Sequence, residues 1–173
     1  NQQQASAQGA LVAAEKEGVL KPAVLYGNDG ADGKDDGRFA FHEISASAQY
    51  YVNRAPTNGF GAILERTFAG RGLAYNVYVN YETSTGSARR RMVYQGDPSD
   101  NAVAAQSTVT LYDDDVLYIP ADGDPDTFGA KRCDPADSSC SDLASAGDEF
   151  YAQDMASGRV FNVVEVEVVV WRQ

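Results

Sequence analysis

Histidine, lysine and clustered positive charge are scarce in this 173-residue chain, and each scarcity excludes a class of function. The single histidine, His42, argues against a histidine-based catalytic centre or zinc site. Only four lysines accompany ten arginines, and the one basic cluster is Arg89–Arg91. We therefore expect no nucleic-acid partner, because phosphate binding needs clustered positive charge. No apolar run approaches the roughly 20 residues of a membrane span, and no signal-peptide pattern is present.

Known catalytic motifs are also missing. The chain has no G-x-S-x-G nucleophile motif, phosphate-binding loop or dinucleotide fingerprint. His42 stands between Phe41 and Glu43, where a structural role is more typical than that of a general base. An Asp/Glu pair acting as in glycoside hydrolysis has nothing to distinguish it from surface carboxylates. A secreted hydrolase is therefore the hypothesis that we favour least, and we expect that the protein is not an enzyme.

Acidic residues are abundant, with 17 Asp and 8 Glu giving a net charge of −11. An Asp-rich, Lys-poor surface keeps a protein hydrated when salt screens its charges, so we expect adaptation to high salt. An acidic protein from an ordinary environment is the alternative. Residues 113–154 carry twelve acidic and two basic residues, whereas the rest of the chain is nearly neutral. We expect one globular domain over residues 1–173, with residues 113–154 as its loop-rich acidic insert.

Two cysteines, Cys133 and Cys140, lie in the stretch C-D-P-A-D-S-S-C. Six intervening residues with a proline can close a small loop, so the spacing predicts a local disulfide. A zinc site would need further ligands, and only aspartates surround this pair. A disulfide favours a compartment outside the cytoplasm.

Several acidic clusters resemble what calcium needs, since calcium takes six to eight oxygen ligands. The clusters are Asp113–Asp115, then Asp122, Asp124 and Asp126, and finally Asp29, Asp32, Asp35 and Asp36. An EF-hand starting at Asp122 fails, because Thr127 stands at the glycine position and Cys133 at the glutamate position. We expect solvated loops and no cofactor. Asp122, Asp124 and Asp126 are the best candidates if calcium does bind.

Hydrophobic periodicity predicts two helices. Residues 2–17 are rich in Ala, Gln and Glu and end at Gly18, and residues 56–70 carry apolar residues at helical spacing after a cap at Thr57 or Asn58. Residues 19–26 are apolar but interrupted by Pro22, and residues 39–51 fit either a strand or a helix.

Four strands are predicted, at residues 73–82, 88–95, 103–112 and 160–171, with a hairpin turn at residues 84–87. They indicate an α+β fold in which an antiparallel sheet of about four strands packs against the N-terminal helix and a second helix. Strand order along the chain is the simplest arrangement, and insertion of the last strand elsewhere is the alternative.

Charged residues on these strands have expected partners. Alternation directs Glu165 and Glu167 to solvent, opposite the valines of the last strand. Arg89, Arg90 and Arg91 alternate between the two faces, and we expect pairing with Glu82 across the hairpin. The functional alternative is that the three arginines dock an acidic neighbouring subunit.

Several stretches together resemble an uncharacterised family of haloarchaeal type IV pilin-like, or pseudopilin-like, surface proteins. They are A-P-T-N-G-F-G-A-I-L-E-R-T-F at 55–68, A-Y-N-V-Y-V-N-Y at 74–81, M-V-Y-Q-G-D-P-S-D-N-A-V at 92–103, T-V-T-L-Y-D-D-D at 108–115, and Y-A-Q-D with F-N-V-V-E-V-E-V-V-V-W-R at 151–172. The resemblance omits the loops at 27–50 and 116–147. It implies a pilin-like fold, with a hydrophobic helix ahead of the segment Gln2–Gly18 and an external globular domain.

The resemblance implies a non-enzymatic, membrane-anchored cell-surface domain that acts as a minor pilin or pseudopilin in filament assembly or surface attachment of a halophilic archaeon. Its partners would be other pilin-like subunits or surface proteins, and residues 1–18 would continue the anchoring helix as a stalk. The alternative is a calcium- or ligand-binding extracellular recognition module that uses the acidic loops.

Overall fold

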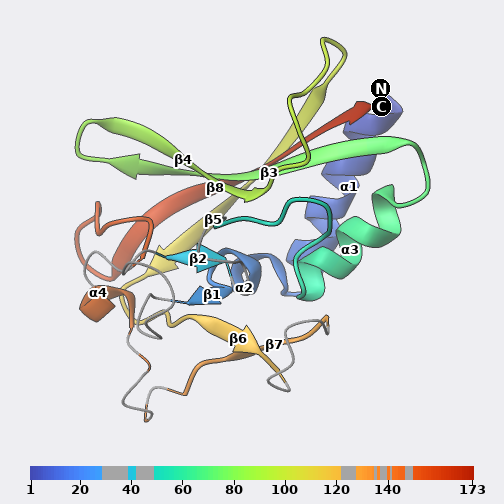
Figure 1. Cartoon of the computed structure of the whole chain (residues 1–173). Helices are drawn as coiled ribbons and strands as arrows, with labels where there is room; N and C mark the ends of the chain where they lie inside the picture. The colour runs from blue at the N-terminus through green and yellow to red at the C-terminus, as the bar shows by residue number, and fades with distance from the viewer. Residues whose placement is uncertain are drawn as a thin grey trace.

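The computed structural model describes residues 1–28, 39–41, 49–121, 128–134, 136, 140, 142–146 and 150–173 (Figure 1). The helices are α1 (Gln2–Lys16), α2 (Leu20–Val24), α3 (Gly59–Phe68) and α4 (Leu143–Ala146). The strands are β1 (Gly27–Asn28), β2 (Ala40–Phe41), β3 (Leu73–Thr83), β4 (Gly86–Val93), β5 (Val103–Tyr112), β6 (Tyr118–Pro120), β7 (Ala130–Arg132) and β8 (Val160–Arg172). The α+β class and the four-stranded antiparallel sheet are confirmed.

Strand β8 lies inside the sheet, whose order is β4-β3-β8-β5. The simplest prediction, strand order along the chain, is therefore wrong. The register places Val168 between Val77 of β3 and Ala105 of β5. The reason is burial: Val164, Val166, Val168 and Val170 are all at most 1% exposed. A strand this apolar is best satisfied when neighbours pair with both of its edges.

Helices α1 and α3 cover one face of the sheet, which we call the inner face (Figure 1). From α1, the small residues Ala7, Ala10 and Ala14 are buried with Leu11, so the helix lies close to the sheet. From α3, the buried residues repeat at helical spacing and are Phe60, Ile63, Leu64 and Phe68. These side chains share one hydrophobic core with the inward-facing valines of β3 and β8.

Helix α3 is shorter than the predicted span of residues 56–70. Asn58 caps it, because its side-chain oxygen accepts a hydrogen bond from the Gly61 amide at 2.9 Å. Gly61 itself is required by close contact, since a β-carbon there would lie 1.5 Å from the carbonyl oxygen of Pro56. After the helix, Gly70 and Gly72 adopt positive φ angles of 74° and 65°, which turn the chain into β3.

The segment 19–26 forms the short helix α2 despite Pro22. Proline is tolerated there because it occupies the first turn, where backbone amides have no partner within the helix. Of the ambiguous segment 39–51, the structure describes strand β2 and residues 49–51, and residues 42–48 lie outside the described residues.

The connection from β4 to β5, residues 94–102, joins opposite edges of the sheet and therefore crosses β3 and β8. It crosses the face opposite the helices, which we call the outer face. There the side-chain amide of Asn76 donates to the Gly96 carbonyl at 2.9 Å and accepts from the Gln95 amide at 2.7 Å. These contacts explain why Asn76, on an outward-facing position of β3, is completely buried.

The molecule has two distinct ends. The start of α1 and the end of β8 lie together at one of them (Figure 1). The hairpin of β6 and β7, which belongs to the acidic insert, lies at the other (Figure 1). The chain therefore enters the domain at the end remote from the insert.

Candidate functional site

A polar network crosses the outer face and involves all four strands of the sheet. Its centre is Glu167 on β8, which is 9% exposed. Glu167 accepts hydrogen bonds from Arg89 of β4 at 2.6 Å, from Asn80 of β3 at 3.2 Å and from Gln106 of β5 at 3.4 Å. Asn80 also donates to Glu165 at 3.2 Å. The network therefore links the strands through side chains as well as through the backbone.

Arg89 pairs with Glu167 and not with Glu82, so the predicted pairing across the hairpin is wrong. The register explains the difference, because Arg89 stands opposite Asn80 whereas Glu82 stands opposite Ser87. From this position the guanidinium reaches past Asn80 to β8, donates to the Asn80 carbonyl oxygen at 3.0 Å, and lies 4.2 Å from the centre of the Tyr78 ring. The prediction that Glu167 faces solvent is also wrong, since three strands surround its carboxylate.

Arg90 points to the inner face. Its guanidinium donates hydrogen bonds to the Phe39 carbonyl and, at 2.9 Å, to the side chain of Gln49. It also lies 5.9 Å from the Tyr151 ring. Arg90 therefore joins the segments on either side of residues 42–48 to the sheet, which is a structural role.

Arg91 returns to the outer face, 3.8 Å from the centre of the Tyr94 ring and 5.5 Å from that of Tyr50. Tyr94 donates a hydrogen bond to Asp97, and this bond raises the pKa of the tyrosine. The three arginines thus have different surroundings. Only Arg89 and Arg91 share the outer face on which a partner could reach them.

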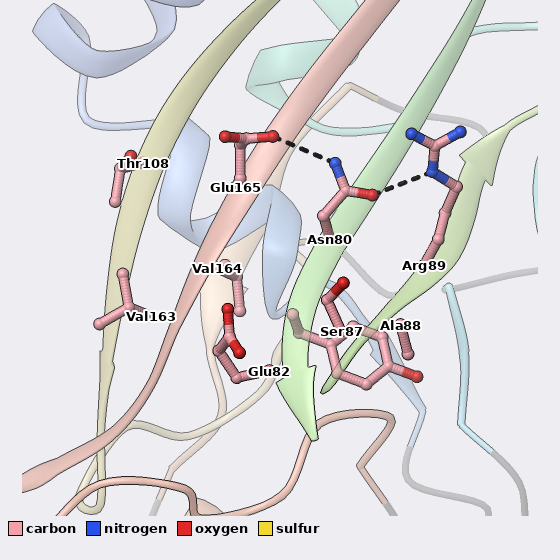
Figure 2. Close-up of a pocket in the computed structure, with 10 residues that line it drawn as sticks. Asn80, Glu82, Ser87, Ala88, Arg89, Thr108, Val163, Val164 and Glu165 are labelled. Carbon is pink, nitrogen blue, oxygen red and sulfur yellow. Dashed lines mark hydrogen bonds between the residues drawn. The ribbon is translucent and has the colours of Figure 1, made fainter. Parts of the chain in front are cut away.

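An open hollow of about 530 Å³ lies beside the network (Figure 2). Its lining includes Asn80, Glu82, Arg89, Glu165 and Val163. Figure 2 shows Asn80 bridging Arg89 and Glu165. Carboxylates outnumber the one guanidinium here, so the hollow is suited to polar or cationic contacts.

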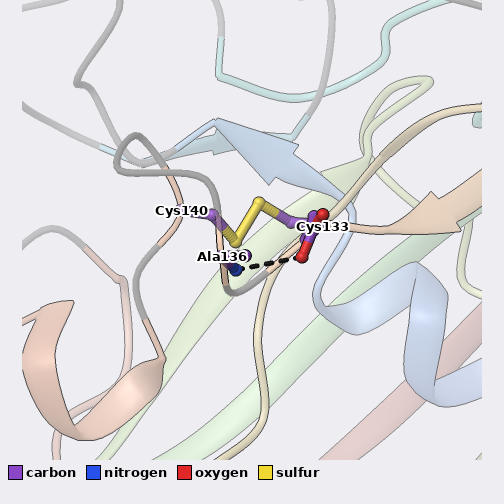
Figure 3. The surroundings of a disulfide bond; sticks show 4 residues. Cys133, Ala136 and Cys140 are labelled. Atoms are coloured by element: carbon purple, nitrogen blue, oxygen red, sulfur yellow. Dashed lines mark hydrogen bonds between the residues drawn. A yellow bond between two sulfur atoms is a disulfide. The ribbon is translucent and has the colours of Figure 1, made fainter.

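The predicted disulfide is present between Cys133 and Cys140 (Figure 3). Cys133 directly follows β7, and its amide donates to the Leu117 carbonyl at 2.9 Å, which extends the β6–β7 pairing. Asp134 accepts a hydrogen bond from the Ala136 amide at 2.9 Å. The disulfide therefore closes a short loop at the end of the β6–β7 hairpin.

The aspartates of the first acidic cluster have different structural partners. Asp115 pairs with Lys21 at 2.7 Å and accepts from the Tyr112 amide. Asp113 lies near Asp154, and its pKa is raised. The main cause is partial shielding from water, and the negative charge of Asp154 and a hydrogen bond with Asp154 raise the pKa further. Within the described residues, no group of three or more acidic, histidine or cysteine side chains could hold a metal ion.

Other predicted site residues lie outside the described residues. These are the metal candidates Asp122, Asp124 and Asp126, the acidic loop residues Asp29, Asp32, Asp35 and Asp36, and His42.

Sequence analysis missed Asn80, Gln106 and Tyr78 as members of the outer-face network. Asn80 and Tyr78 occupy alternate positions of β3 whose side chains lie on the outer face. Alternation predicts the face on which a side chain lies, but it does not predict which residues the side chain contacts. Their roles follow only from the central place of β8, which brings Glu167 beside both β3 and β5.

Comparisons with known proteins supply a family and no assigned chemistry. No curated protein matches the chain, and no solved structure matches it. The model of one family, described as "Family of unknown function (DUF7288)", matches residues 1–170. Because this match extends over nearly the whole sequence, the chain belongs to that family.

Proposed function

We propose that this chain is a non-enzymatic surface domain of a halophilic archaeon that acts as a minor pilin or pseudopilin. In this proposal the domain is held at the cell surface through the start of α1, it contacts other pilin-like subunits or surface proteins, and it presents the acidic insert away from the membrane. The resemblance of residues 55–68, 74–81, 92–103, 108–115 and 151–172 to haloarchaeal pilin-like proteins is its sequence basis.

The main support for the proposal is that the start of α1 and the acidic insert lie at opposite ends of the molecule (Figure 1). The start of α1 lies at one end of the molecule, and the β6–β7 hairpin lies at the other (Figure 1). Helix α1 is fixed to the domain along its length by Ala7, Ala10, Leu11 and Ala14, all at most 3% exposed. A tether joined to such a helix would hold the whole domain in a defined orientation, with the acidic insert outermost.

Two further observations agree with a surface location. The Cys133–Cys140 disulfide is of the kind that persists in oxidising compartments outside the cytoplasm. The Asp-rich composition and net charge of −11 suit a protein exposed to concentrated salt. None of the helices in the described residues is long and apolar enough to cross a membrane.

The decisive experiment is to find the native protein in its host. Membrane, filament and culture-medium fractions would be analysed by mass spectrometry, with the mature N-terminus determined in each fraction. We expect a membrane- or filament-associated species that carries about 20 apolar residues ahead of Asn1. A second readout is labelling of Lys131, in the acidic insert, by a membrane-impermeant amine reagent on intact cells.

A freely secreted species that begins near Asn1 would contradict the proposal. So would a membrane-bound species whose Lys131 is protected from the reagent on intact cells but labelled after lysis. Labelling of the exposed Lys16 in α1 can be compared with labelling of Lys131, because Lys16 lies on the stalk helix and not in the insert.

A further inference from the structure

The two edge strands of the sheet, β4 and β5, differ in how far they are protected from pairing with another chain. Along the β4 edge, Tyr51 extends the backbone pairing: its amide donates to the Met92 carbonyl at 2.9 Å, and its carbonyl accepts from the Tyr94 amide at 2.8 Å. Strand β4 also carries three consecutive arginines. Charge and an added segment are the usual ways in which proteins protect an edge strand from pairing with another chain.

Strand β5 forms the opposite edge and has neither protection. Its ten residues, V-A-A-Q-S-T-V-T-L-Y, include no charged residue and no proline. Hydrogen bonds at its two ends identify the backbone groups that point away from β8. Gln4 donates its side-chain amide to the Ala104 carbonyl at 3.1 Å, and the Tyr112 amide donates to Asp115 at 2.7 Å.

In an antiparallel strand, the amide and carbonyl of one residue point to the same side, and the side alternates along the chain. Because those of Ala104 and Tyr112 point outward, those of Gln106, Thr108 and Thr110 do so too. No described residue hydrogen-bonds to these outward backbone groups. Gln106 and Thr108 are exposed and Thr110 is partly exposed, so the edge is accessible between its two ends.

Apolar side chains are exposed on both sides of this open edge. Val163, which stands opposite Thr110 on the outer face, is 46% exposed (Figure 2). Val12 of α1, the helix whose Gln4 and Glu15 contact β5, is 40% exposed, and Tyr112 at the end of β5 is 38% exposed. A second strand placed beside β5 would therefore meet apolar contacts above and below the new backbone hydrogen bonds.

We propose that the β5 edge is a self-association surface at which two copies of this chain pair antiparallel about a two-fold axis at Thr108. This register matches Gln106 of one copy with Thr110 of the other, and Thr108 with Thr108. Gln106, Thr108 and Thr110 of each copy, whose backbone amides and carbonyls point away from β8, then form hydrogen-bonded pairs with the other copy. The pairing makes about six new backbone hydrogen bonds. A second copy fits because the exposed stretch is self-complementary in this register and brings no charged β5 side chain against another.

Electrostatics give the pairing a characteristic salt dependence. Each copy has a net charge of −11, and Glu15 accepts a hydrogen bond from Ser107, close to the proposed axis. The two Glu15 carboxylates would therefore lie near each other across the interface. Since salt screens like-charge repulsion, the association constant should rise with sodium chloride concentration. This inference stands without the proposed surface function, because it concerns two copies of the domain in solution.

Sedimentation velocity at increasing protein concentration, in low and high salt, tests the proposal. We expect a monomer–dimer equilibrium that shifts toward dimer in high salt. Thr108→Pro removes the outward amide at the axis and should lower the association constant at least about ten-fold, equivalent to about 1.4 kcal/mol. Circular dichroism and urea unfolding establish that this variant is folded, which is expected because the lost amide does not pair with β8.

Cysteine cross-linking tests the register and does not depend on the proline variant. In this register the two α-carbons at position 108 lie about 5.5 Å apart, within reach of a disulfide. Thr108→Cys should therefore form a covalent dimer on mild oxidation, whereas Thr85→Cys, in the β3–β4 turn, should not. Gln106→Cys should cross-link to Thr110→Cys in a mixture and not to itself.

A monomer at every concentration and salt level would overturn the proposal. So would a dimer that Thr108→Pro leaves intact, or one that Thr108→Cys fails to cross-link. None of these outcomes bears on where the native protein is located, so failure here is distinguishable from failure of the surface-domain proposal.

Discussion

Removal of the Arg89 guanidinium should destabilise the domain more than removal of the charge that it pairs with. The Arg89 side chain is 52% exposed, whereas that of Glu167 is 12% exposed. In Arg89→Met, the donors that the described residues still offer to the Glu167 carboxylate are the side-chain amides of Asn80 and Gln106. In Glu167→Gln, the guanidinium left behind can still reach water. The cost therefore depends on which partner is removed.

The magnitude follows from the burial of the two groups. Breaking a fully buried ion pair by removing one partner costs roughly 3–5 kcal/mol, and an exposed pair contributes about 0–1 kcal/mol. Because Arg89 is half exposed and Glu167 retains two amide donors, Arg89→Met should lower the free energy of unfolding by about 1–2 kcal/mol. Glu167→Gln should cost less than about 1 kcal/mol, since it leaves no buried charge.

Urea unfolding monitored by circular dichroism measures both changes, and equal m-values would establish that the unfolding transition is comparable. Arg91→Met is the matched control, because Arg91 shares β4 and the outer face but stacks on Tyr94. If Arg89→Met costs no more than Arg91→Met, or no more than Glu167→Gln, then the guanidinium does not compensate a shielded carboxylate and the reasoning is wrong.

Two further predictions concern a close contact and a titrating group. Gly61→Ala should lower the free energy of unfolding by at least about 2 kcal/mol, because backbone atoms occupy the space of the added methyl group. Gly9→Ala, in a helix position with open space, should instead raise it by about 0.5–1 kcal/mol, and equal effects in urea unfolding would contradict this. The raised pKa of Asp113 means that the folded state binds the proton more tightly than the unfolded state, so this group's contribution to stability falls as pH rises from about 3.9 toward the folded pKa. Asp154→Asn should lower the Asp113 pKa, measured by carboxyl NMR titration, and an unchanged titration would refute the role of Asp154.

Most elements of this fold were predictable because their signals are local. Alternation over residues 73–82 and 160–171 indicated two long strands, and the structure has β3 and β8 there. Apolar residues at helical spacing and a cap at Asn58 indicated α3, whose observed start is at Gly59. The disulfide was also accessible from sequence, since a proline and six intervening residues limit the loop that must close.

The outer-face network was not predictable, because it depends on strand order. Arg89 and Glu167 are 78 residues apart in sequence and meet only because β8 lies next to β3. Local reasoning instead paired Arg89 with Glu82, the nearest acid on the hairpin. An offset of two residues along β3 separates them, since Glu82 stands opposite Ser87 and Asn80 stands opposite Arg89. Burial of the β8 valines was the available signal for a central strand.

The surface-domain and self-association proposals together restrict how two copies can meet. Gln4 contacts Ala104 and Glu15 contacts Ser107, so α1 runs along β5 in the direction of the strand. Antiparallel pairing about Thr108 reverses this direction in the second copy, and the two α1 helices then start at opposite ends of the dimer. Two domains held through α1 on one flat membrane point the same way and cannot adopt this arrangement. Pairing through β5 would therefore join domains that project from opposing surfaces or from neighbouring filaments, which is the geometry of attachment rather than of growth within one filament.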